Sequence, residues 1–365
     1  MIHTVQYKAL RRISSMKPTV RHRTAMLSLV AAASVYVFAV SVGLAVASQD
    51  GDEAEEQELV SLSSIVGAAL LGQIIPAEEP FGWANDYWKG TEQTTFVPFT
   101  LTVDQSKLST PTVAMFVVAT RQGAAAADST AVSPGRTEAS TLPPLAFEDA
   151  FHLNLGAPTA DGVYEIRRAF WVPGGDYVVY VALSESGVPD GTEAKTMMLK
   201  RAVTVPNLWS DQLTTSSVIQ AARIESLRAP PPANQQLANP YTLGTMRIVP
   251  KRIPEYLKSE EISLVFLVYN AGLTASGLPD VHVEYTFNTR RSPGDEYFNR
   301  TNPQDFNEQT LPPGFDLAAG HQLVAGQAVP LSGFPEADYR LEIKVTDNTN
   351  GASLIRHVDF SVSAS

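Results

Sequence analysis

The 365-residue chain contains no cysteine. It therefore cannot form disulfides, and it offers no thiolate for a metal site, for nucleophilic catalysis or for lipid attachment. Basic residues are also few, since 27 Lys and Arg stand against 38 Asp and Glu. Six of the basic residues and none of the acidic ones lie in the first 47 residues, so residues 48–365 carry a net charge of −17. This charge argues against nucleic acid and against anionic membrane surfaces as partners.

The N-terminal segment has the three parts of a secretory signal peptide. A basic stretch from Lys8 to Arg23 runs into an apolar run, Ala25–Ala47, which ends in Ala45-Val46-Ala47. A positive region, an apolar region and a small-x-small site predict export and cleavage before Ser48. The run is about 20 residues long, which is also enough for an uncleaved membrane anchor. Both interpretations place residues 48–365 outside the cytoplasm, in the periplasm, at the cell surface or secreted.

The segment that follows is first acidic and then apolar. Asp50–Glu58 is rich in acidic residues and is expected to be disordered. In Leu59–Ile75 the apolar residues recur near helical spacing, which predicts a short helix or an irregular arm. Its apolar side needs a partner surface, and we expect the first folded domain to supply it.

A first β domain is predicted over residues 81–206. Short segments rich in Val, Phe, Tyr and Thr alternate with Gly, Pro and Asp turns, as in a β-sandwich. The small, polar, Pro-rich stretch Gly123–Pro144 reads as a long surface loop within this domain. The expected strands are Thr94–Val103, Thr112–Thr120, Ala146–Leu155, Val163–Val172, Asp176–Ser184 and Met197–Val205.

A second β domain is predicted over residues 241–365, after a stiff polar connector at 207–240. The connector contains Ser216–Leu227, which suits one strand or a short helix. Strict apolar–polar alternation marks the strands of the second domain, and one further strand is apolar on both faces. These strands are Val281–Phe287, Tyr339–Val345, Val358–Val362 and, apolar throughout, Ile262–Tyr269.

One short pattern occurs in both halves. Val172-Pro173 precedes Asp176-Tyr177, and Phe334-Pro335 precedes Asp338-Tyr339, each pair opening a strand. In Ig-like and fibronectin-type sandwiches, a Tyr near the start of a late strand bonds back to the preceding corner. The repeat predicts two sandwiches of related design, each with such a tyrosine corner.

The stretches Leu213–Val218 and Phe334–Val362 resemble uncharacterised exported bacterial proteins with tandem Ig-like or fibronectin-III-like domains. Some of these are similar to the β-domains that accompany GWxTD and von Willebrand type A modules in envelope proteins. Gly82-Trp83-Ala84-Asn85-Asp86 differs from GWxTD at one position. The resemblance covers about residues 90–365 and implies β-sandwich domains without a known activity.

No catalytic or cofactor-binding constellation is evident in the sequence, so we expect neither an enzyme nor a cofactor. The histidines after residue 47 lack metal-ligand spacing, and three of them fall on polar strand faces. Asp347–Gly351 resembles the start of a calcium loop, but Val358 occupies the position of the bidentate carboxylate. This segment is therefore expected to be the turn between the last two strands. The four histidines are His152, His282, His321 and His357.

One aromatic cluster is the candidate ligand or partner surface, since exposed Trp and Tyr can stack on sugars or anchor a protein. The alternative is that the same residues close the first core. We expect a non-catalytic exported protein that binds or scaffolds an envelope or extracellular protein. The alternatives are a carbohydrate-binding module and, third, a hydrolase with carboxylates on loops. The cluster comprises Phe81, Trp83, Tyr87 and Trp88.

Overall fold

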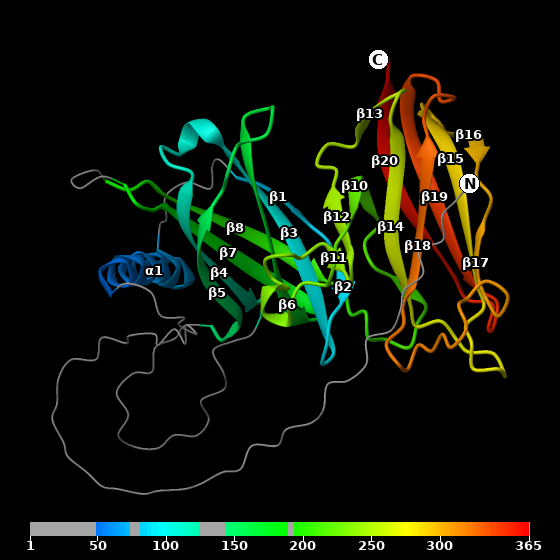
Figure 1. Ribbon diagram of the computed structural model, residues 1–365, viewed down its shortest axis with the longest axis horizontal. Coiled ribbons are helices and arrows are strands. Elements are labelled where there is room, and N and C mark those ends of the chain that lie inside the picture. The colour runs from blue at the N-terminus through cyan, green and yellow to red at the C-terminus, as the bar shows by residue number, and fades with distance from the viewer. Residues whose placement is uncertain (1–48, 74–80, 124–142, 189–192, 365) are drawn as a thin grey trace, which may run out of the picture. The chain divides into compact units, whose positions relative to one another are not determined.

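The computed structural model describes residues 49–73, 81–123, 143–188 and 193–364. They are mostly β and form four sheets, which confirms the all-β class with two Ig-like or fibronectin-III-like sandwiches (Figure 1). Both sandwiches belong to one compact unit of the chain, Ser48–Ser365. The expected signal peptide or anchor, residues 1–47, lies outside the described residues, as does most of the expected loop at 123–144.

The first sandwich consists of a sheet that we name A and a sheet that we name B. In sheet A, β3 pairs with β6 on one side and with the short strands β1 and β2 on the other; sheet B has the order β5-β4-β7-β8. A short 3-10 turn, η1 (Gln105–Lys107), follows β3. The strands are β1 (Phe81–Asn85), β2 (Trp88–Lys89), β3 (Thr94–Asp104), β4 (Thr112–Arg121), β5 (Leu145–Asn154), β6 (Val163–Pro173), β7 (Gly175–Glu185) and β8 (Thr196–Val205).

The second sandwich consists of sheets C and D. Sheet C has the order β11-β12-β10-β14-β18 with β9 beside β14, and sheet D the order β13-β20-β19-β15-β16 with β17 beside β15. A 3-10 turn, η2 (Ala233–Gln235), lies between β10 and β11. The strands are β9 (Thr214–Thr215), β10 (Ile219–Ser226), β11 (Thr242–Leu243), β12 (Met246–Pro250), β13 (Glu255–Leu257), β14 (Glu261–Tyr269), β15 (Val281–Arg291), β16 (Gly294–Arg300), β17 (Gln304–Phe306), β18 (Leu323–Pro330), β19 (Ala337–Asp347) and β20 (Ser353–Ser363).

Side-chain alternation explains where each core lies. Along β15 and β19 the apolar residues that the sequence placed on one face are buried, and their polar neighbours are not. Successive strand residues point to opposite faces of a sheet, so the apolar residues at every second position all point toward the partner sheet. Tyr285 and Phe287 of sheet D thus meet Leu264 and Phe266 of sheet C in one core, while sheets A and B enclose the other.

Both predicted tyrosine corners are present. The Tyr177 hydroxyl donates to the Pro173 carbonyl at 2.8 Å, and the Tyr339 hydroxyl donates to the Pro335 carbonyl at 2.7 Å. Both side chains are almost completely buried, so the hydroxyl of each would lack a partner without this bond. The shared corner shows that the two sandwiches have the same local design at the start of β7 and β19.

The apolar arm forms a helix, α1 (Gln49–Leu70), which lies on the outer face of sheet B. Leu62 and Val66 are buried there against Phe116 and Ala182. The expectation of disorder over Asp50–Glu58 is wrong, because this segment supplies the first turns of the helix. Among the described residues, no helix combines the length and apolar character that crossing a bilayer requires.

The structure also differs from the expected connector at 207–240. Within that range, β10 pairs with β14 over 219–221 and with β12 over 221–226, so it is an interior strand of sheet C. The second sandwich therefore begins before residue 241, near β9. The prolines at 230–232 suggest a linker, but they lie in the loop between β10 and β11.

A proline in β3 divides the neighbouring edge strand into β1 and β2. Asn85 pairs with Phe99 and Trp88 with Phe96, which leaves Pro98 opposite the gap at residues 86–87. Proline has no N–H to donate to a strand on that side. The Asp86 N–H still donates to the Pro98 carbonyl at 2.9 Å, and the chain bends away from sheet A there.

The bend brings Asp86 and Tyr87 to the second sandwich. The Tyr87 N–H donates to the Ser217 hydroxyl, and the Ser217 N–H donates to the Tyr87 carbonyl, both at 3.0 Å. Beside these bonds, Trp88 and Phe96 of sheet A pack with Ile219 of sheet C in a buried cluster. The outer faces of sheets A and C thus cover each other, and α1 covers the outer face of sheet B. In the described chain, the outer face of sheet D is therefore the one that no other element covers.

Candidate functional site

The four aromatic residues proposed from the sequence do not form one exposed surface. Phe81 and Trp88 are buried, while Trp83 and Tyr87 are half-buried. Phe81 and Trp83 close the first core, where the Trp83 ring stacks on Phe99 with centroids 4.5 Å apart. Trp88 instead meets Tyr241 edge-on in the cluster between the sandwiches. Closure of the first core therefore accounts for only part of the group.

The outer face of sheet D is formed by polar side chains that lie opposite one another across the strands. Asn288 of β15 pairs with Tyr297 on one side and Arg340 on the other, and Arg340 pairs with Asp359 of β20. These four residues make one row across the sheet. Cross-strand neighbours of opposite charge stabilise such a face by roughly 0.2–1 kcal/mol per pair.

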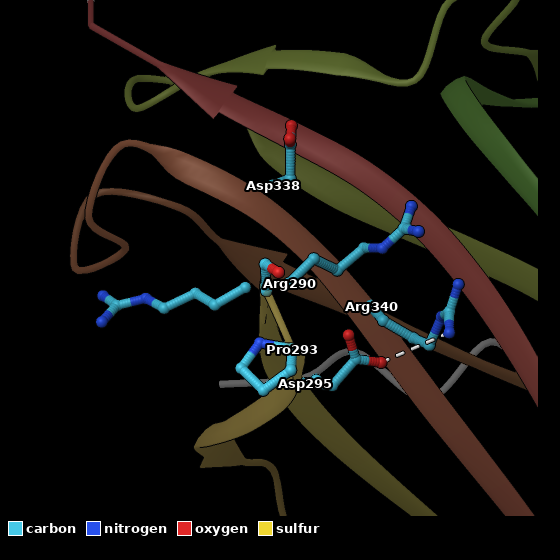
Figure 2. A pocket seen from close by; sticks show the side chains of 8 residues that line it. Arg290, Pro293, Asp295, Asp338 and Arg340 are labelled. Carbon is cyan, nitrogen blue, oxygen red and sulfur yellow. Dashed lines mark hydrogen bonds and ion pairs between the residues drawn. The ribbon is translucent and has the colours of Figure 1, made fainter.

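An open hollow of about 620 Å³ lies at one end of this face, beside the turn from β15 to β16. Figure 2 shows Arg290 and Arg340 with Asp295 and Asp338 around it, and Pro293 at the turn. Arg340 contacts the Asp295 carboxylate at 3.3 Å, the interaction drawn as a dashed line. The hollow is thus lined by cations and carboxylates that come from three neighbouring strands.

Asp359 fixes the arginines beside the hollow. Its two oxygens accept from Nε and Nη2 of Arg340 at 2.8 and 3.0 Å, and Nη1 of Arg290 lies 3.0 Å away. Hydrogen bonding from Arg340 lowers the pKa of the Asp359 carboxyl, and the same contact raises the pKa of the guanidinium. Two-point bonds of this kind hold an arginine in one orientation, so Arg340 is presented as a fixed cation.

Tyr297 supplies the apolar part of this surface. It lies on the edge strand β16, in the same row as Arg340 with Asn288 between them, and 60% of its surface is exposed. Arg291, at the end of β15, pairs with Glu296 at 3.4 Å, but it continues the core-facing set of Tyr285, Phe287 and Thr289 and does not lie on the outer face. We call Tyr297, Arg340 and Arg290 the sheet D patch. The sequence does not indicate this patch because β16 has no alternating pattern, and only the pairing with β15 puts Tyr297 in one row with Arg340.

The histidines lie apart from one another. His152 bonds to Glu58 of α1 at 3.0 Å, His282 to Asp305 at 2.6 Å, and His357 lies 3.6 Å from Glu342. Within the described ranges, no group of three or more His, Asp or Glu is placed to hold a metal ion.

The segment Asp347–Gly351 is the turn between β19 and β20, as expected. The buried Asp347 carboxylate accepts from the Thr349 N–H at 3.0 Å and from the Gly272 N–H at 2.7 Å. Its oxygens thus tie two loops of the second sandwich together, which is a structural role.

Comparisons with known proteins add little. No protein-family model matches the chain, and no curated protein matches it. Two solved structures with some likeness are trypsin-activated alpha-2-macroglobulin from Escherichia coli and the native conformation of the E. coli protein. Both are 12% identical to this chain. The first match covers 80% of this chain and 17% of the solved chain, with a TM-score of 0.23. The second match covers 78% of this chain and 16% of the solved chain, with a TM-score of 0.19. This chain thus spans less than a fifth of their length, and TM-scores this low carry no argument.

Proposed function

We propose that this chain is a non-catalytic exported protein that binds another protein of the envelope or the extracellular space through the sheet D patch. The supporting observation is an exposed tyrosine in the same cross-strand row as a fixed arginine on the open face of sheet D. Tyr and Arg are enriched among the residues that dominate binding energy in protein interfaces. The proposed family resemblance to exported bacterial proteins with tandem sandwiches is in keeping with this role.

The charges of the patch indicate the chemistry of the partner. Arg290 and Arg340 both pair with Asp359, and the carboxylates of Asp295 and Asp359 leave no strong net charge. A partner surface with a matching alternation of charge would fit it, and such complementarity gives specificity more than affinity. The aromatic ring of Tyr297 would supply an apolar contact from the edge strand β16.

A pull-down from envelope extract tests the proposal. Proteins recovered with the wild-type chain should be lost with Tyr297→Ala and with Arg290→Ala. Arg201→Ala is the matched control, because Arg201 is exposed on β8 of the first sandwich, away from sheet D. A partner that binds all four chains equally contradicts the proposed surface, and binding to a glycan array without any protein partner favours the carbohydrate-binding alternative.

Export is a separate part of the proposal and has its own test. It rests on Ala45-Val46-Ala47 after the apolar run. Mass spectrometry of the exported protein should find Ser48 at the N-terminus. An intact Met1 in the membrane fraction supports an uncleaved anchor instead, and an intact chain in the cytoplasm contradicts export.

A further inference from the structure

A cleft of about 390 Å³ opens between the outer face of sheet A and the strands of sheet C. The wall from sheet A consists of small side chains: Gly82 and Ala84 of β1, and Thr100 and Thr102 of β3. These positions face outward because their neighbours Phe81, Phe99 and Leu101 face the first core. Larger residues at these positions would fill the space between the sheets, so the cleft exists because this end of sheet A is lined by small residues.

The floor of the cleft holds polar groups in a dry setting. The Tyr241 hydroxyl donates to the Asp86 carboxylate at 2.9 Å, and the Tyr241 side chain is 3% exposed. Burial raises the pKa of Asp86, and it also raises the pKa of Tyr241. The oxygens of Asp86 can also accept a hydrogen bond from a ligand hydroxyl.

Ion pairs form the side of the cleft. Glu165 of β6 pairs with Arg167 on its own strand, and its other oxygen lies 3.4 Å from Nε of Arg252, which follows β12. Arg252 also pairs with Asp161. The Nε of Arg167 is buried and has no hydrogen-bond partner in the described part of the chain. The side chain as a whole is 32% exposed, so the outer part of the guanidinium can donate to an acceptor brought by a ligand.

The charges of the cleft point to the class of ligand. The lining cations Arg167, Lys251 and Arg252 are each paired with a carboxylate, so the cleft has little net field to attract an ion. These carboxylates are Glu165, Glu260 and Asp161. It has instead many fixed donors and acceptors within a space at the small end of ligand pockets, which run from about 300 to 1,000 Å³. Neutral molecules with several hydroxyl groups match this combination of size and hydrogen-bonding capacity.

We propose that the cleft between sheets A and C binds a neutral sugar of one or two rings, with its hydroxyl oxygens accepting from Arg167 and its hydroxyl groups bonding Asp86 and Glu165. This site is separate from the sheet D patch. It also differs from the aromatic cluster of the sequence analysis, since hydrogen-bonding groups on facing sheets carry the recognition. The proposal is thus a second binding activity, independent of the proposed protein partner.

The test uses the chain from residue 48 onward and a fixed set of probes: glucose, galactose, mannose, N-acetylglucosamine, cellobiose, chitobiose and, as an acidic counterpart, glucuronic acid. Saturation-transfer NMR identifies binders, and calorimetry measures their affinity. At least one neutral sugar should bind, and more tightly than glucuronic acid. Ala84→Trp should abolish binding by filling the cleft from its exposed wall. Ala202→Trp, at an exposed alanine on β8, should leave it unchanged.

A second variant keeps the test sharp if Ala84→Trp disturbs the fold. Arg167→Lys retains the charge but removes the planar guanidinium donors, and we expect about a tenfold loss of affinity, typical for one hydrogen bond. The proposal is overturned if no neutral sugar binds the wild-type chain, if glucuronic acid binds as tightly as the neutral sugars, or if a folded Ala84→Trp chain binds unchanged. None of these results affects the pull-down with Tyr297→Ala, so the two proposals fail separately.

Discussion

Replacing Tyr339 by Phe tests the tyrosine corner of the second sandwich. The Tyr339 hydroxyl donates to the Pro335 carbonyl at 2.7 Å, and the side chain is completely buried. Its ring stacks on Phe360 with centroids 5.3 Å apart and meets Phe334 edge-on. Phenylalanine keeps these ring contacts, so the change removes the hydroxyl group and its bond and little else.

The magnitude follows from what the change leaves behind. Pro335 is exposed, so water can replace the lost donor at its carbonyl, and the cost is the net value of one hydrogen bond, about 0.5–1.5 kcal/mol. Two further changes bracket this value. Ile343→Ala opens a cavity in the same strand and should cost about 2–5 kcal/mol. Lys344→Ala removes an exposed ion pair with Glu284, 3.3 Å long, and should cost about 1 kcal/mol or less.

Urea unfolding followed by two signals is the assay. All four tryptophans (Trp83, Trp88, Trp171 and Trp209) precede the second sandwich, so their fluorescence reports on the first sandwich and the contact between the two. Circular dichroism reports on both sandwiches. Because the buried cluster around Trp88 joins sheet A to sheet C, we expect Tyr339→Phe to lower the midpoint of both signals together.

Two results would refute this reasoning. Equal losses from Ile343→Ala and Lys344→Ala would mean that β19 is not half-buried, and the second sandwich would be assigned wrongly. A fluorescence midpoint that is unchanged while the circular dichroism midpoint falls would mean that the sandwiches unfold separately.

Three other changes test the remaining parts of the structure. Burial raises the folded pKa of Asp86 above its unfolded value of about 3.9, so the free energy of unfolding falls as pH rises from about 4 through the folded pKa. Asp86→Asn should lose this slope, so its free energy of unfolding should increase relative to that of the wild type toward pH 7. Urea titrations that give parallel curves of free energy against pH for the two chains would contradict this. Leu62→Ala should cost about 2–5 kcal/mol in thermal or urea unfolding by opening a cavity between α1 and sheet B, unless α1 does not dock there. A fragment of residues 207–365 should give dispersed NMR spectra and a fragment of residues 241–365 should not, because only the longer fragment contains β10. A folded 241–365 fragment would mean that the second domain begins at residue 241, as the sequence predicts.

The sequence predicted strands well where alternation and turns agree. Val163–Val172 was expected and β6 runs from Val163 to Pro173, and all the other long strands of the first sandwich agree to within two residues. The corner pattern also located Tyr177 and Tyr339 correctly. These features depend on local side-chain chemistry, which a sequence displays directly.

What the sequence could not predict depends on contacts between distant segments. The sequence of Ser216–Leu227 suits either a strand or a short helix, because its partner strands β12 and β14 are about 25 and 45 residues further along the chain. The acidic residues of α1 suggested disorder, yet Glu58 accepts from the Ser186 hydroxyl at 2.6 Å, a partner 128 residues away. The sheet D patch and the cleft likewise require residues from three or more strands, so no local pattern marks them.

The docking of the sandwiches at Pro98 has a consequence for recognising related chains. The paired bonds between Tyr87 and Ser217 use the backbone of residue 87, so any residue other than proline can form them there. The side chains around this point could therefore diverge extensively while the two modules keep the same mutual placement. Distant homologues with this arrangement would share a proline within the first long strand and a hydroxyl residue just before β10, rather than the aromatic residues around them.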